Sequence, residues 1–95
     1  MYIRIHRSAG CQEVVGICDQ ELLGTTLAEG DLNMVISPSF FGEHLATEEE
    51  ILAALHDCGN INMFGERCID LAVRHGFVER ESCRMIAGVP HAIIL

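Results

Sequence analysis

The chain has 95 residues, a length that fits one domain and leaves no room for two. Its formal net charge is −8 and all six of its basic residues are arginine, which argues against direct binding to nucleic acid through the phosphates. The apolar runs are far shorter than the ~18–20 residues that span a bilayer, and the N-terminal segment lacks the features of a signal peptide. We therefore expect one domain, residues 1–95, in the cytoplasm and away from membranes.

The first half of the chain is predicted to consist mainly of strands. Residues 1–6 alternate apolar and polar side chains, residues 14–18 form a second apolar run, and the turn between them favours a hairpin. Asp19 is expected to cap a short helical turn over residues 20–23. A third strand is predicted over residues 32–36, with alternate side chains on one face.

The second half is predicted to contain two helices and two further strands. A Thr-x-x-Glu capping box begins the first helix at Thr47, and Gly59 is expected to end it. A second helix is predicted over residues 66–75, with a glycine-containing C-terminal motif after it. Residues 83–87 and 91–95 are predicted strands, and the unbroken apolar run at the end of the second predicts burial on both faces.

Strands near both ends of a chain, with two helices between them, are typical of an α+β fold. The sequence therefore predicts a small mixed or antiparallel sheet with two main helices packed on one face. Residues 60–65, between the two helices, fit either a connector or a short strand, so the strand order stays open.

The five cysteines do not have the spacing of a known zinc motif, and none forms a C-x-x-C pair. Their spacing favours small buried hydrophobic side chains. A disulfide, of the kind that intracellular proteins of hyperthermophiles contain, and a metal site are the alternatives. We expect no metal and no cofactor. The cysteines are Cys11, Cys18, Cys58, Cys68 and Cys83.

An ordered set of segments resembles an archaeal protein family. In order and spacing it is similar to the archaeal domain of unknown function, family 424, over almost the whole chain. The resemblance implies an archaeal cytosolic protein and suggests a context linked to translation or RNA. It supplies no activity, cofactor or catalytic residue. The segments are residues 15–24, residues 39–42, residues 62–67 with Leu71 and Ala72, and residues 86–92.

The predicted start of the second helix is one candidate site. Backbone N–H groups at Gly65 and Glu66, with the guanidinium of Arg67, are suited to hold a phosphate or carboxylate. The structural alternative is a turn at Gly65, a dipole contact at Glu66 and a solvated Arg67. His91 follows a rigid turn at Pro90 and is a candidate ligand or base, or a structural histidine. Together these four would bind an anionic small molecule if the fold brings them side by side.

Two further pairs of residues have both a functional and a structural interpretation. Cys18 ends a strand where a helical turn begins, so its thiol is either an activated nucleophile or buried beside a capping Asp19. Phe40 and Phe41 lie in residues 37–42, which proline and glycine exclude from the preceding strand. An exposed aromatic pair would contact a partner, whereas an inward pair would pack on the core.

No Ser-His-Asp order, Walker loop or H-x-x-x-H motif occurs in the chain. The leading hypothesis is a small non-catalytic protein-binding or adaptor module that contacts an unknown protein partner through Phe40 and Phe41. The alternative is a small enzyme or a binder of an anionic small molecule that uses Gly65, Glu66, Arg67 and His91. A third hypothesis is a homodimer held together by the excess of apolar side chains.

Overall fold

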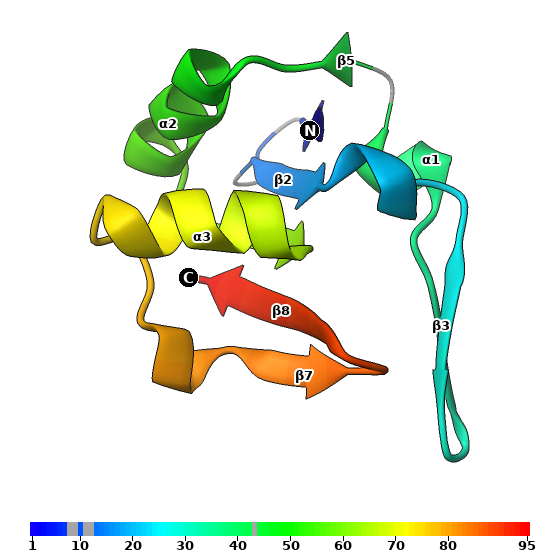
Figure 1. Ribbon diagram of the computed structural model, residues 1–95. Coiled ribbons are helices and arrows are strands. Elements are labelled where there is room, and N and C mark those ends of the chain that lie inside the picture. The colour runs from blue at the N-terminus through cyan, green and yellow to red at the C-terminus, as the bar shows by residue number, and fades with distance from the viewer. Residues whose placement is uncertain (8–9, 11–12, 43) are drawn as a thin grey trace.

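A six-stranded mixed sheet is the frame of the fold (Figure 1). The computed structural model describes residues 1–7, 10, 13–42 and 44–95. The strands lie in the order β5-β1-β2-β6-β8-β7; β2 and β6 are parallel, and the other neighbours are antiparallel. The strands are β1 (Tyr2–His6), β2 (Val14–Cys18), β5 (His44–Leu45), β6 (Ile61–Phe64), β7 (Arg84–Ile86) and β8 (Val89–Ile94).

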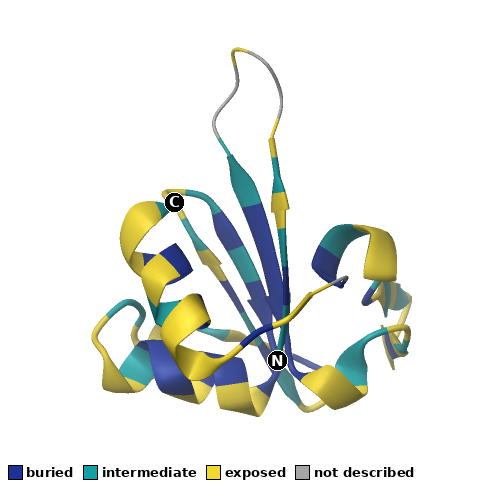
Figure 2. Ribbon diagram, turned by 90° about the horizontal axis from the view of Figure 1, so that it is seen from above, coloured by how far each residue is buried: buried dark blue, intermediate teal, exposed yellow. Residues whose placement is uncertain are grey.

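The two main helices cover one face of this sheet, and smaller elements cover part of the other (Figure 2). The helices are α2 (Glu48–Asp57) and α3 (Glu66–Arg74). The smaller elements are η1 (Gln20–Leu22), α1 (Pro38–Phe41) and a hairpin of β3 (Thr26–Glu29) and β4 (Leu32–Val35). A further short turn, η2 (Arg80–Ser82), precedes β7. The predicted α+β fold, with two main helices on one face of a mixed sheet, is confirmed.

Local sequence signals explain how the main helices begin and end. At the start of α2, the hydroxyl of Thr47 accepts from the Glu50 N–H and the Glu50 carboxylate accepts from the Thr47 N–H, both at 3.2 Å. The predicted capping box is therefore confirmed. At the end of α3, Gly76 has a φ of 78°, and the N–H of Phe77 donates to the carbonyl of Ala72 at 2.9 Å. This is the predicted C-terminal motif.

Period-two alternation along the strands builds two separate cores. Side chains such as Val15, Ile17 and Met63 point from the sheet toward α2 and α3, where they are fully buried. The neighbouring positions point to the opposite face, where Cys18 and Phe64 pack under the hairpin and α1. The elements over the second core cover only part of that face, so this side of the sheet, unlike the side under α2 and α3, has surface left for a partner to contact.

The last strand departs from its prediction of burial on both faces. Ala92 is buried under the helices, but the side chain of Ile93 is 54% exposed and that of Leu95 is 89% exposed. The prediction is wrong because the hairpin and α1 do not extend over this part of β8. The turn also lies earlier than predicted: Ala87 and Gly88 have φ values of 50° and 78°, as in a two-residue hairpin loop, so Pro90 is inside the strand.

Three elements in the first half were not predicted, namely β3, α1 and the two-residue strand β5. β3 pairs with β4 as an antiparallel hairpin, whereas the sequence indicated only the second of these strands. Residues 37–42 contain a helical turn, α1, because the hydroxyl of Ser37 caps the Ser39 N–H at 3.1 Å and Pro38 suits the first helical position. No helix in the described ranges is long and apolar enough to cross a membrane.

Candidate functional site

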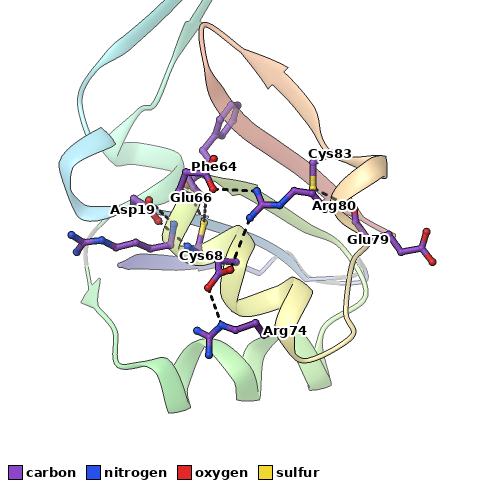
Figure 3. A network of polar contacts seen from close by, with 11 residues as sticks. Asp19, Phe64, Glu66, Cys68, Arg74, Glu79, Arg80 and Cys83 are labelled. Carbon is purple, nitrogen blue, oxygen red and sulfur yellow. Dashed lines mark hydrogen bonds and ion pairs between the residues drawn. The ribbon is translucent and has the colours of Figure 1, made fainter.

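The start of α3 already holds a carboxylate that belongs to the chain itself. Asp19 is only 2% exposed; its Oδ2 accepts from the Arg67 N–H and its Oδ1 from the Cys68 N–H, both at 2.9 Å (Figure 3). Asp19 therefore caps α3, and its side chain does not cap η1 as predicted. An external anion would have to displace Asp19, so the structure argues against the predicted anion site at the start of this helix.

The residues of the predicted small-molecule site do not come together. Glu66 forms an ion pair with Arg80 at 3.1 Å (Figure 3). It also lines a small cavity beside Asp19. Arg67 lines a different cavity, which α3 shares with Met1 and with Glu48 at the start of α2. The ring of His91 lies on the opposite face of the sheet, stacked on Phe64 with the ring centroids 4.2 Å apart. The combination proposed from the sequence is therefore corrected: these side chains line three separate cavities.

His91 instead shares a groove with the two phenylalanines that were predicted to contact a partner. The groove has a volume of about 380 Å³ and lies between the hairpin, α1 and the partly covered face of the sheet. We call it the β4–α1 groove. Its lining consists of Met34 and Val35 from β4, Phe40 and Phe41 from α1, Asn62 and Phe64 from β6, and His91 and Ile93 from β8.

A continuous row of aromatic rings supports the groove. The row runs His6, Phe40, Phe41, Phe64, His91, with centroid separations of 4.8, 4.8, 5.6 and 4.2 Å. The two end pairs are stacked, and the two inner contacts are edge-to-face, both of which are favourable arrangements. Each ring is thus positioned by its neighbours, which gives the groove a fixed shape.

The two phenylalanines of α1 have different environments. Phe41 is 5% exposed and belongs to the second core, so its side chain packs inward. Phe40 is half-buried: its ring and carbonyl lie directly over Gly16, where a Cβ would be 2.5 Å from the Phe40 carbonyl oxygen. His6 Nε2 also donates to that carbonyl at 2.9 Å. The predicted pair therefore divides into one core residue and one residue at the groove wall.

The polar groups of the groove are an amide and a neutral histidine. His91 Nε2 lies 3.3 Å from Asn62 Oδ1. Burial lowers the pKa of His91 below 6.5, and the neighbouring Arg84 lowers it further, so the ring is uncharged at neutral pH. Arg84 lies directly opposite His91 on β7, outside the groove lining. None of the residues lining the groove carries a carboxylate.

The cysteines that the structure describes are free thiols. Cys18 and Cys68 are fully buried; Cys18 precedes Asp19 in the chain, and the Cys68 N–H donates to its carboxylate. Cys11 lies outside the described residues. Burial, followed by the charge of Asp19, raises the pKa of Cys18 to about 12 and that of Cys68 well above 9.0. Neither thiol is activated as a nucleophile. Within the described ranges, no three or more His, Cys, Asp or Glu side chains are grouped to hold a metal.

We expect Cys18 and Cys68 to react with iodoacetamide much more slowly than Cys58 and Cys83 in the native protein. The first two are buried and almost entirely protonated at mildly alkaline pH, whereas the last two are partly exposed. Mass spectrometry of peptides after timed labelling measures the rates, with urea-unfolded protein as the control. Rapid native modification of Cys18 would contradict its burial.

Comparison with known proteins agrees with this architecture. The family model described as "Protein of unknown function (DUF424)" matches residues 6–95. The chain belongs to this family. The resemblance predicted from the ordered segments is thereby confirmed, and no curated protein sequence matches the chain.

A solved structure has the same fold. It is described as the crystal structure of an uncharacterized conserved protein from Methanopyrus kandleri. The sequence identity is 24% and the TM-score is 0.78, with 98% of this chain and 88% of that chain covered. At this identity the likeness supports the DUF424 fold alone, so the function has to be argued from the groove.

Several groove residues were missed in the sequence. Asn62 and Phe64 alternate with the buried Ile61 and Met63, so the period of two along residues 61–64 was the signal that places them on the opposite face. The missing information was the hairpin, because without β3 and β4 the second face of the sheet has no groove wall. Ile93 was assigned to the core because the sequence does not show that the hairpin leaves this part of the face uncovered.

Proposed function

We propose that this DUF424 chain is a small non-catalytic protein-binding module that receives an apolar side chain of a partner in the β4–α1 groove. The observation that carries the proposal is the pair of exposed apolar side chains on the groove. Val35 is 57% exposed on β4, and Ile93 is 54% exposed on β8. Exposed apolar residues beside a concave apolar cavity are typical of an interaction site.

The support beneath the groove favours binding. Phe41 and Phe64 are buried and stack in one row with the half-buried Phe40 and His91, so a partner would meet a surface that needs little reordering. Among the groove residues, His91 is the titratable side chain, and its polar contact is the amide of Asn62. This combination supplies shape and one or two hydrogen bonds, as a recognition site requires.

We expect Ile93→Asp to weaken peptide binding by at least about tenfold, because it places a charge in the apolar contact. Short random peptides displayed on phage would be selected on the native protein, and the strongest would be synthesised and titrated by fluorescence anisotropy. Met85→Asp is the matched control, since Met85 is 50% exposed but lies outside the groove lining.

The two variants together decide whether the groove is the site. The proposal requires Met85→Asp to bind the peptide as the native protein does and both variants to unfold at similar urea concentrations. Equal binding by Ile93→Asp and the native protein would remove the groove as the interaction site. Selection of no peptide at all would argue against a protein-binding module.

A further inference from the structure

The outer edge of β4 has main-chain groups that point away from β3. The N–H of Ile36 donates to the carbonyl of Thr25 at 2.8 Å, which identifies this pair as hydrogen-bonded. In an antiparallel ladder such pairs alternate with pairs whose N–H and C=O groups point outward. The register pairs Val35 with Thr26 and Asn33 with Ala28, so Val35 and Asn33 direct their main-chain groups to the free side of β4.

This free edge borders the β4–α1 groove. Met34 and Val35 line the groove, whereas β3 contributes none of the lining. β3 lies toward the β7–β8 turn, where the Glu29 carboxylate accepts from the Ala87 N–H at 3.1 Å. In the part of the chain that the structure describes, β3 is the strand that pairs with β4. The open edge and the apolar cavity are therefore adjacent.

We propose that an extended segment of a partner protein pairs with the free edge of β4 as a third strand of the hairpin; this inference rests on the proposed function and specifies its partner. Such strand addition uses main-chain hydrogen bonds for affinity and alternate side chains for specificity. Every second side chain of the added strand points to the same side as Leu32 and Met34, which pack toward the sheet. One of these side chains enters the groove above His91 and Ile93.

The charges around the groove define the chemistry of that segment. Arg84 is exposed beside His91, and it forms no ion pair with a carboxylate of the described residues. The groove lining is free of acidic side chains, although the chain as a whole has a net charge of −8. The complementary segment therefore has a strand-forming sequence with an apolar inward residue and an acidic residue close to it.

The first test removes one main-chain donor from the edge. Val35→Pro eliminates the outward N–H without removing a bond to β3, and proline is tolerated at such edge positions. The probe is the phage-selected peptide of the preceding section, titrated by fluorescence anisotropy. We expect Val35→Pro to lower the affinity at least about tenfold. Ala28→Pro, at the equivalent position on the outer edge of β3 and outside the groove lining, is expected to bind within about threefold of the native protein.

A second measurement does not depend on the folding of any variant. The same peptide is synthesised with a single N-methyl group at each amide in turn. Strand addition predicts an alternating pattern, in which methylation at every second amide abolishes binding and methylation between them is tolerated. An acidic residue near the inward apolar residue of the selected peptides is also expected, and selected peptides without one would overturn the charge complementarity.

The outcomes separate the mode of binding from the proposed function. If Ile93→Asp abolishes binding, but Val35→Pro does not weaken it and N-methylation of the peptide shows no alternating pattern, the groove remains the binding site and strand addition is overturned. Binding that is indifferent to Ile93→Asp overturns both. The assembly state without peptide is measured by light scattering. A native protein that is a dimer and a Val35→Pro variant that is a monomer would assign the edge of β4 to a second copy of the chain and overturn a separate partner.

Discussion

Replacing Gly65 by alanine is expected to destabilise the protein by about 3–6 kcal/mol, from backbone strain and from two N–H groups, one buried and one partly buried, that lose their acceptor. Gly65 has a φ of 117°, and a Cβ there would lie 2.3 Å from the Asp19 Cγ. The carboxylate would have to move, and it would then lose its bonds to the Arg67 and Cys68 amides. Urea unfolding followed by circular dichroism measures the change in the free energy of unfolding.

Two further variants separate the causes of this loss. Gly76 also has a positive φ, of 78°, but open space around it, so Gly76→Ala is expected to cost only about 1 kcal/mol. In the double variant Asp19→Ala/Gly65→Ala the steric contact is gone. Its loss of unfolding free energy is therefore expected to be smaller than the sum of the losses in the single variants Asp19→Ala and Gly65→Ala. Additivity within about 0.5 kcal/mol would show that Gly65 and Asp19 are not coupled.

Replacing Phe41 by serine is expected to cost about 3–5 kcal/mol, the range for truncating a large buried aromatic side chain. Phe41 is 5% exposed, contacts the rings of Phe40 and Phe64, and packs with Leu27 and Ile36 in the second core. The melting temperature should fall by at least about 12 °C, because each kcal/mol corresponds to about 4–8 °C in a domain of this size. Differential scanning calorimetry gives the value.

Phe40→Ser is the comparison that separates packing from recognition. Phe40 is half-buried against Gly16 and His6, so the loss of stability is expected to be less than half that of Phe41→Ser. Binding of the selected peptide should nevertheless weaken, since the ring forms one wall of the groove. A greater loss of stability for Phe40→Ser than for Phe41→Ser would contradict the assignment of Phe41 to the core.

Local signals predicted the parts of the fold that depend on local contacts. The capping box at Thr47 and the C-terminal glycine of α3 are recognised from a few neighbouring residues, and both are confirmed. β3 was missed because only Leu27 is buried in its short span, which leaves little alternation to detect. The role of Asp19 was also missed, since the amides it binds lie on a helix far along the chain.

The groove could not be predicted because its residues, like Asp19 and the amides it binds, lie far apart along the chain. Its walls come from four elements, and no periodicity relates Val35 and Phe40 to His91. The sequence did identify Phe40, Phe41 and His91 as residues of interest, but it assigned His91 to a site with Glu66 and Arg67, on a different side of the molecule. Which candidates share a site depends on the strand order, and the parallel pairing of β2 with β6 sets that order.

That parallel pairing also determines how the chain reaches its folded state. The β1–β2 and β7–β8 hairpins join neighbouring segments, so each closes a short loop at low entropic cost. Val15, by contrast, pairs with Ile61 only after the hairpin, α1 and α2 have been looped out between them. Joining β2 to β6 is therefore the slow step expected from topology, and the Asp19 contact to α3, which crosses the same junction, becomes available only when this step is complete.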